Sequence, residues 1–252
     1  MTALGFGIDI GGTGTKGAIV DLDTGQLAGE RLRVDTPQPA TPDAIADVVA
    51  DIIETFDWAG PIGIAVPCVV KHGVAQTAAN IDPAWIGVDA DELFAKRLNR
   101  DADDISILND ADAAGIAEVR FGDERARKGV VLLLTFGTGI GSALFIDGRL
   151  VPNTELGHLE VDGHDAEDRA AASAKEHEGL SYPDWAGRVS HYLATLEKAL
   201  WPDLVIVGGG VSKKADKWVP LLRARSTITV ATLKNHAGIV GAAAASAEGI
   251  EH

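Results

Sequence analysis

The chain has 252 residues and carries 22 basic against 37 acidic side chains, a formal net charge of −15. This charge argues against nucleic acid or an anionic membrane surface as a broad partner, because both repel an acidic protein. Cys68 is the only cysteine, which excludes an internal disulfide and a cysteine-rich zinc site. No apolar run reaches the roughly 18 residues of a membrane span and no secretory signal is visible, so we expect a cytoplasmic protein.

A glycine-rich turn at residues 11–14 separates two predicted strands, residues 4–10 and 16–21. A turn without Cβ atoms lets backbone amides approach a ligand, and amides beside threonine hydroxyls and a lysine suit phosphate. A plain glycine turn is the alternative.

The same glycines match the dinucleotide-binding fingerprint, in the spacing Gly12, Gly14 and Gly17. That fingerprint requires a helix directly after the glycines. Here a second turn at residues 23–25 and a third predicted strand, residues 27–34, follow instead. The sequence therefore predicts a β-hairpin and argues against a Rossmann domain.

The first half of the chain predicts one mixed α/β domain over residues 1–109. Thr41 and Pro42 predict the start of a helix whose apolar residues recur at helical spacing as far as Phe56. The remaining predicted elements are a strand at 61–66, a loop or hairpin at 67–73, a helix at 89–98 and a strand at 105–108.

The second half, residues 110–235, predicts a second α/β domain, and a small-residue helix near 236–252 is expected to pack back on the first. Gly137-Thr138-Gly139-Ile140-Gly141 lies between two strands, so it repeats the opening hairpin and suggests two related domains. The other predicted elements are helices at 111–121, 166–176 and 184–200, strands at 129–136, 142–146, 203–207 and 226–232, a turn at 147–148 and a helix capped by Ser212.

Three glycine loops each end a predicted strand: residues 11–14, 137–141 and 208–210. Three such loops are difficult to explain as turns alone and favour phosphate binding. Lysines 16, 213, 214 and 217 lie in or just after these loops. Because cations at a helix N-terminus oppose the helix dipole, we expect the last three to serve a ligand, with a solvated helix face as the alternative.

Two further groups of polar residues are candidates for chemistry. Asn109-Asp110 ends a strand and opens a helix, so Asp110 is either a helix cap or a base that accepts a hydroxyl proton. Glu155, His158 and Glu167 suit hydrogen bonds to sugar hydroxyls, although loop charges would look the same. His158 with His164 and Asp162 also suggests a metal site, but the spacing fits no standard pattern.

Taken together, five segments resemble the ROK family of sugar kinases, within the actin/Hsp70/hexokinase superfamily. They are Asp9-Ile10-Gly11-Gly12-Thr13, Asn109-Asp110, Gly137-Thr138-Gly139-Ile140-Gly141, Glu155-Leu156-Gly157-His158 and Gly208-Gly209-Gly210. The resemblance extends over about residues 5–245. It implies an α/β, two-domain actin-like ATPase (ribonuclease H-like) fold, in which each domain is a mixed sheet with flanking helices.

Two features resemble the polyphosphate-using kinases of actinobacteria within that family, which include the polyphosphate/ATP glucomannokinases. ROK kinases usually carry a cysteine-rich zinc motif after Glu-x-Gly-His, whereas residues 159–165 contain no cysteine. The segment at 208–218, Gly-Gly-Gly-Val-Ser-Lys-Lys-Ala-Asp-Lys-Trp, is also similar to those enzymes.

The resemblance implies that a phosphoryl group passes from polyphosphate or ATP to the 6-hydroxyl of glucose, with Asp110 as the general base. Glucose would be held by Asn80, Asn109, Asp110, Glu155, His158 and Glu167. The donor would be held by Gly11, Gly12, Thr13, Lys16, Gly137, Thr138, Gly139, Gly209, Gly210, Lys213, Lys214 and Lys217. Mg²⁺ would neutralise the donor, with Asp9 holding it through water. The family also implies a homodimer, and no structural zinc is expected.

The main alternative is an ATP-dependent ROK kinase for another hexose, such as mannose, fructose or an N-acetylhexosamine. A non-catalytic, sugar-binding ROK regulator is a more distant one, because the hairpin begins by residue 5 and leaves no room before it for a DNA-binding domain. A chaperone-like or actin-like ATPase would need larger insertions.

Overall fold

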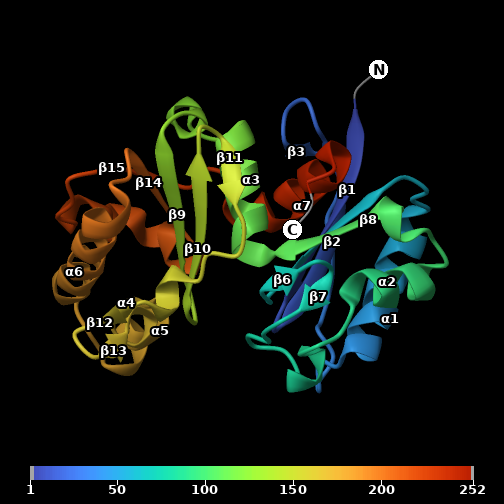
Figure 1. Ribbon diagram of the computed structural model, residues 1–252, viewed down its shortest axis with the longest axis horizontal. Helices are drawn as coiled ribbons and strands as arrows, with labels where there is room; N and C mark the ends of the chain where they lie inside the picture. The colour runs from blue at the N-terminus through green and yellow to red at the C-terminus, as the bar shows by residue number, and fades with distance from the viewer. Residues whose placement is uncertain (1–2, 251–252) are drawn as a thin grey trace. The chain divides into compact units, whose positions relative to one another are not determined.

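The structure is a computed structural model that describes residues 3–250 (Figure 1). The chain forms two compact units. Unit 1 contains the residues up to Ala117 and those from His236 onward, and unit 2 is Glu118–Asn235. Within residues 3–250, we find no helix with the length and apolar character needed to cross a membrane.

Unit 1 is built on a mixed sheet with the strand order β3-β2-β1-β5-β8, in which β4 also pairs with β2. Strands β1 and β2 are antiparallel, whereas β5 and β8 run parallel to β1. The elements are β1 (Leu4–Gly11), β2 (Gly14–Asp21), β3 (Gln26–Leu27), β4 (Leu32–Val34), α1 (Pro42–Phe56), β5 (Ile62–Val66), β6 (Val70–Lys71), β7 (Val74–Ala75), α2 (Ala90–Leu98), β8 (Ile105–Asn109) and α7 (Ala237–Glu248). Helix α3 (Asp110–Phe121) begins in unit 1.

Unit 2 repeats this topology, with the strand order β11-β10-β9-β14-β15. Strands β9 and β10 are antiparallel, and β14 and β15 run parallel to β9. The elements are β9 (Val130–Phe136), β10 (Ile140–Ile146), β11 (Arg149–Val151), β12 (Glu160–Val161), β13 (His164–Asp165), α4 (Ala166–Ala170), α5 (Ala172–His177), α6 (Tyr182–Leu200), β14 (Leu204–Gly208) and β15 (Thr227–Val230). The internal repeat inferred from the two glycine turns is therefore present as two sheets of the same order.

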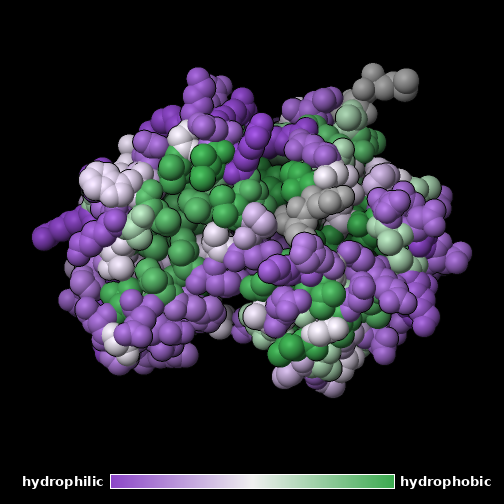
Figure 2. Space-filling model, viewed as in Figure 1, coloured by the Kyte–Doolittle hydropathy of each residue, from purple (hydrophilic) through white to green (hydrophobic). Residues whose placement is uncertain are grey.

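The helices form where the capping and periodicity signals indicate. Thr41 caps α1, because its hydroxyl accepts a hydrogen bond from the amide of Ala44. The helix starts at Pro42, directly after this cap. Helix α6 buries one face, which includes Trp185, Val189 and Leu193, against the unit 2 sheet. Hydrophilic side chains cover the outer side of α6, at the left of Figure 2. Each unit thus has its own apolar core.

Helix α7 packs closely on the sheet of unit 1, beside β1 in Figure 1. A Cβ atom added at Gly7 or at Gly63 would lie closer than 3.0 Å to backbone atoms of α7. Glycine at these strand positions lets the helix backbone rest directly on the strands. The C-terminal helix therefore belongs to the packing of unit 1.

Two predicted elements are interrupted in the structure. The strand expected at residues 27–34 is split into β3 and β4, because these pair with different parts of β2 and residues 28–30 between them are exposed. The helix expected at 166–176 breaks at Ala171, whose backbone is extended. There the indole N–H of Trp185 donates to the carbonyl groups of Ala170 and Ala171.

Helix α3 is fixed in unit 2 by a buried carboxylate. Glu118 is 1% exposed and accepts hydrogen bonds from the amides of Thr232 and Leu233 and from the Thr232 hydroxyl. Three donors satisfy a buried carboxylate, which would otherwise be costly to desolvate. The C-terminal end of α3 is therefore held firmly against the 232–233 segment.

Candidate active site

The first glycine turn, residues 11–14, is held through its carbonyl groups. The Thr36 hydroxyl donates to the Gly11 carbonyl (2.6 Å), and the Arg33 guanidinium donates to that of Thr13 (2.9 Å). Gln38 donates to the carbonyl of Gly12 at 3.2 Å. A turn whose acceptors are already engaged is stabilised in one conformation, as a preformed phosphate loop requires.

Asn80 lies directly against this turn. A Cβ atom at Gly12 would be 2.8 Å from the Asn80 carbonyl oxygen, so only glycine fits here. Asn80 is exposed and has a left-handed backbone, with φ of 60°. The structure thus brings together Asn80 and the loop predicted to bind phosphate.

Asp9 and Lys16 face each other across the β1–β2 hairpin. They are paired in the strand register, and the Lys16 ammonium lies 2.8 Å from a carboxylate oxygen of Asp9. Both side chains are partly exposed. One carboxylate beside a phosphate loop fits Mg²⁺, which is usually held by one or two carboxylates together with waters and substrate phosphates. Among residues 3–250 there is no cluster of three or more His, Cys, Asp or Glu side chains that would form an all-protein metal cage.

Asn109, rather than Asp110, caps helix α3. Its side-chain oxygen accepts from the amides of Ala111 (2.8 Å) and Asp112 (3.2 Å), and its side-chain nitrogen donates to the Cys68 carbonyl (3.0 Å). The alternative in which Asp110 is the cap is therefore wrong. Asn109 is buried and its amide is engaged within the protein, whereas Asp110 is exposed as the first helical residue.

The negative charge of Asp110 affects the thiol of Cys68. The pKa of Cys68 is raised to about 12, first by burial and then by the negative charge of Asp110. The carboxylate of Asp110 therefore lies at the carboxyl end of β8, close to the loop that follows β5. Ligands of α/β proteins bind at such strand ends.

In unit 2, the three residues predicted to bind the sugar lie together. The Nδ1 atom of His158 is 3.8 Å from a carboxylate oxygen of Glu167. The pKa of Glu155 is raised, mainly by burial and also by the charge of Glu167, while His158 opposes the shift. The Tyr192 hydroxyl donates to the Leu156 carbonyl at 2.9 Å and so fixes the short 3₁₀ turn that carries His158.

Glu167 also connects this cluster to the second glycine loop. Its second carboxylate oxygen accepts from the Ile140 amide at 3.0 Å, and a Cβ atom at Gly139 would lie 2.5 Å from that oxygen. Ser173 donates to the carbonyls of Gly137 (3.0 Å, from its amide) and Thr138 (2.5 Å, from its hydroxyl). As in the first loop, residues of another segment donate hydrogen bonds to the carbonyl groups of the glycine loop.

The third glycine loop differs from the prediction. Gly209 has φ of 83°, and a Cβ atom there would collide with the backbone of Phe136. A kinked 3₁₀ segment, Gly210–Lys217, follows in place of an α-helix capped by Ser212, whose hydroxyl donates to the Gly209 carbonyl instead. The helix-dipole argument therefore does not apply to Lys213, Lys214 and Lys217. All three are nevertheless exposed beside the loop.

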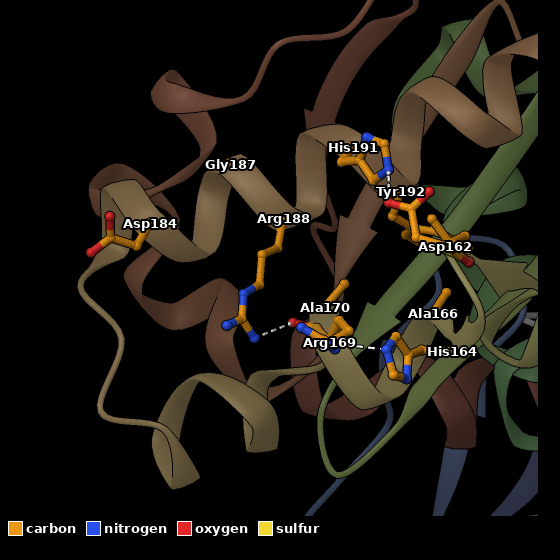
Figure 3. Close-up of a pocket in the computed structure, with 11 residues that line it drawn as sticks. Asp162, His164, Ala166, Arg169, Ala170, Asp184, Gly187, Arg188, His191 and Tyr192 are labelled. Carbon is orange, nitrogen blue, oxygen red and sulfur yellow. Dashed lines mark hydrogen bonds and ion pairs between the residues drawn. The ribbon is translucent and has the colours of Figure 1, made fainter.

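A short hairpin, β12–β13, occupies the segment in which ROK kinases usually carry their cysteine-rich zinc motif. His164 accepts a hydrogen bond from Arg169 at 2.8 Å, and Asp162 lies 2.8 Å from His191 of α6. These pairs border a cavity of about 450 Å³ between the hairpin, α4 and α6 (Figure 3). His158, His164 and Asp162 each have a different partner, so the structure does not gather them as metal ligands.

Several residues that hold the site were not predicted from the sequence. Arg33, Thr36, Gln38 and Ser173 fix the two loops, and Asp165 lies 3.0 Å from the Nδ1 atom of His158. No spacing signal marks them, because each meets its partner through the fold.

Comparisons with known proteins identify the family and the fold. The sequence profile described as the ROK family matches residues 5–179. Polyphosphate glucokinase of Mycobacterium tuberculosis is 56% identical over 248 residues, which are 98% of this chain and 93% of that protein. Polyphosphate glucokinase of Mycobacterium leprae is 53% identical over 98% of this chain and 76% of that protein.

Among solved structures, the inorganic polyphosphate/ATP-glucomannokinase of Arthrobacter sp. strain KM has a TM-score of 0.91 at 50% identity, covering 98% of this chain and 99% of that one. A ROK family glucokinase from Streptomyces griseus has the same fold, with a TM-score of 0.78 at 24% identity over 96% of this chain and 98% of that one. The predicted actin-like α/β fold is confirmed, and the chain belongs to the ROK family.

Proposed function

We propose that this chain is a phosphotransferase that moves a phosphoryl group from inorganic polyphosphate, and also from ATP, to the 6-hydroxyl of glucose, giving glucose 6-phosphate. The observation that carries the proposal is the position of Asp110. It is exposed at the end of β8, and its neighbour Asn109 caps helix α3. The identity of 56% to a polyphosphate glucokinase supports the same reaction.

In this proposal Asp110 accepts the proton of the 6-hydroxyl while the sugar oxygen attacks the terminal phosphorus. The O–H bond of the sugar breaks and its oxygen forms a bond to the terminal phosphorus. The bond between that phosphorus and the bridging oxygen of the donor breaks, which releases the shortened polyphosphate or ADP. Asn80, Glu155, His158 and Glu167 hold the other sugar hydroxyls, so that the attacking oxygen is oriented. Asn109 acts by holding the start of α3.

The glycine loops bind the donor through their backbone amides, and Lys16 and the lysines of 213–217 add positive charge. Asp9 would hold Mg²⁺ through water, and the metal would neutralise part of the phosphate charge. We also propose a cytoplasmic homodimer, with one domain made of residues 1–109 and the C-terminal helix and the other of residues 110–235. The packing of α7 on β1 and β5 supports the first of these domains.

The function is tested by measuring glucose 6-phosphate formation with polyphosphate or ATP as the donor, in the presence of Mg²⁺. We expect turnover with polyphosphate at micromolar enzyme, abolished by removal of the metal with a chelator. Product from ATP alone would instead indicate an ATP-dependent ROK kinase. Tight glucose binding without turnover from any donor would indicate a regulator.

The exposed lysines after the third glycine loop provide a second prediction. Polyphosphate is a long polyanion, and a chain of charge −15 needs local cations to hold it. Replacing Lys213 and Lys214 together with Ala is expected to raise KM for polyphosphate about 10-fold, equivalent to about 1.4 kcal/mol, and to leave KM for glucose within about twofold. Increasing ionic strength should reduce the difference between wild type and variant.

The matched control is the double replacement of Lys128 and Lys198 with Ala. Both are exposed lysines of unit 2, so this variant changes the net charge by the same amount away from the loop. An equal rise in KM for polyphosphate in the two double variants would show that overall charge, rather than Lys213 and Lys214, holds the donor.

A further inference from the structure

The hairpin β12–β13 returns the chain to the side of His158. Glu160 pairs with Asp165 and Val161 with His164, and the connecting residues Asp162 and Gly163 have φ of 54° and 78°. Two left-handed residues in a two-residue turn give a tight hairpin of fixed register. The position of Asp165 is therefore set by the hairpin rather than by a flexible loop.

Asp165 bonds to one ring nitrogen of His158. The Nδ1 atom of His158 lies 3.0 Å from a carboxylate oxygen of Asp165. An ionised carboxylate only accepts hydrogen bonds, so Nδ1 must carry the proton. The lone pair of the neutral ring is then on Nε2, which is left for a ligand. The imidazole is about half-exposed, so a sugar hydroxyl can reach it.

Three carboxylates face this imidazole. The pKa of His158 is raised, first by the hydrogen bond to Asp165 and then by the charges of Glu167 and Glu155, while partial burial opposes the shift. Glu155 and Glu167 belong to the proposed sugar site. Asp165 approaches from the hairpin, on the Nδ1 side of the ring.

We propose that Asp165 is the positioning residue for His158: it fixes the Nδ1–H tautomer and the ring orientation so that Nε2 meets a hydroxyl group of glucose. The hexose part of this inference rests on the proposed function. The carboxylate that orients His158 thus comes from the hairpin. The segment 159–165 that carries it contains no cysteine. At metal sites, loss of the hydrogen-bond partner of a ligating histidine typically costs about 10- to 100-fold in metal affinity or activity, and we expect the lower end of that range for this sugar-binding histidine.

The hairpin is also held from its other side, independently of His158. The Arg169 guanidinium only donates, so His164 accepts through Nε2, and the turn residue Asp162 pairs with His191 of α6 (Figure 3). These contacts leave Asp165 in place whether or not a ligand occupies the site. They also provide a control, because Asp162→Asn removes the charge paired with His191 while asparagine keeps the left-handed turn, so the hairpin and Asp165 stay in place beside His158.

Two-dimensional ¹H–¹⁵N NMR of the histidine rings tests the positioning role without any assay of activity. In wild type we expect a single Nδ1–H tautomer and a raised pKa for His158. In Asp165→Asn the charge that favours the imidazolium is lost, so the pKa should fall and the Nε2–H tautomer should appear. Asp162→Asn should change neither. An unchanged His158 titration and tautomer in Asp165→Asn would overturn the proposal.

The direction of the pKa shift of His158 also determines how the stability of the protein depends on pH. A folded-state pKa above the unfolded value contributes stability that is fully present below the unfolded pKa and is lost as pH rises through the folded pKa. The stability difference between wild type and Asp165→Asn should therefore shrink as pH rises past the raised pKa of His158. A difference that is constant across this range would indicate a purely structural role.

Kinetics then connects the tautomer to the sugar. Asp165→Asn should raise KM for glucose about 10-fold and leave KM for polyphosphate within about twofold, with Asp162→Asn close to wild type on both. A wild-type protein without glucokinase activity would overturn the proposed function, while the NMR titration would still decide the role of Asp165. Loss of the His158 tautomer with an unchanged glucose KM would overturn the substrate-positioning claim alone.

Discussion

Replacing Asp110 with Asn is expected to lower kcat for glucose phosphorylation about 1,000-fold, the size of effect typical for loss of a general base. An amide has nearly the same shape as the carboxylate but does not accept the hydroxyl proton. The sugar oxygen must then attack while still protonated. The KM values for glucose and for the donor should change much less, because the amide still forms hydrogen bonds.

The loss should occur without loss of the fold. Asp110 is exposed, and the first turn of α3 is capped by Asn109, which the substitution leaves in place. Thermal unfolding should therefore coincide with that of wild type. Asp104→Asn, at another exposed aspartate of unit 1, is the matched control and should retain full activity. Substantial activity in Asp110→Asn would assign the base to another residue.

The parts of the fold that follow from local chemistry were predictable from the sequence. Predicted strands on both sides of a glycine turn indicated the β1–β2 and β9–β10 hairpins, and Thr41-Pro42 predicted the start of α1. The Asp147-Gly148 turn likewise lies between β10 and β11, with positive φ at both residues. Each of these signals acts over a few residues, so no tertiary contact is needed to detect it.

The errors arose where a distant partner overrides local preference. The break at Ala171 depends on the indole of Trp185, 14 residues further along the chain. An α-helix capped by Ser212 was expected, but a 3₁₀ path over residues 210–217 leads to the buried Trp218, which packs against Trp185. In both cases an aromatic anchor in the core decides the backbone, and a linear pattern does not report it.

The candidate site shows the same division. Its side chains at strand ends and in glycine turns were predictable as types, because carboxylates, amides and glycines have distinct chemistry. Asp165 and Ser173 were missed, because their roles come from hydrogen bonds to residues that a hairpin or a helix brings close. The capping role of Asn109 was also ambiguous, since Asn and Asp are both good caps.

Glycines inside strands gave no turn signal, yet they determine how α7 meets the sheet. Gly63 lies within β5, which pairs with β1 and β8. A Cβ atom there would lie 1.8 Å from the carbonyl oxygen, 2.2 Å from the carbonyl carbon and 3.0 Å from the Cα of Ala242. All three are backbone atoms, so a change of rotamer does not relieve the overlap. Either the helix or the central strand must move.

Gly63→Ala is therefore expected to destabilise the protein by at least about 3 kcal/mol, the upper end of ordinary overpacking, and to lower the melting temperature by on the order of 10 °C. The control is Gly187→Ala in α6, where an added Cβ meets no atom within 4 Å. That substitution should be neutral or stabilising by up to about 1 kcal/mol, because alanine favours a helix more than glycine. Thermal and urea unfolding of both variants compare the two sites. Equal stability of Gly63→Ala and wild type would mean that α7 is not seated on β5 as closely as described.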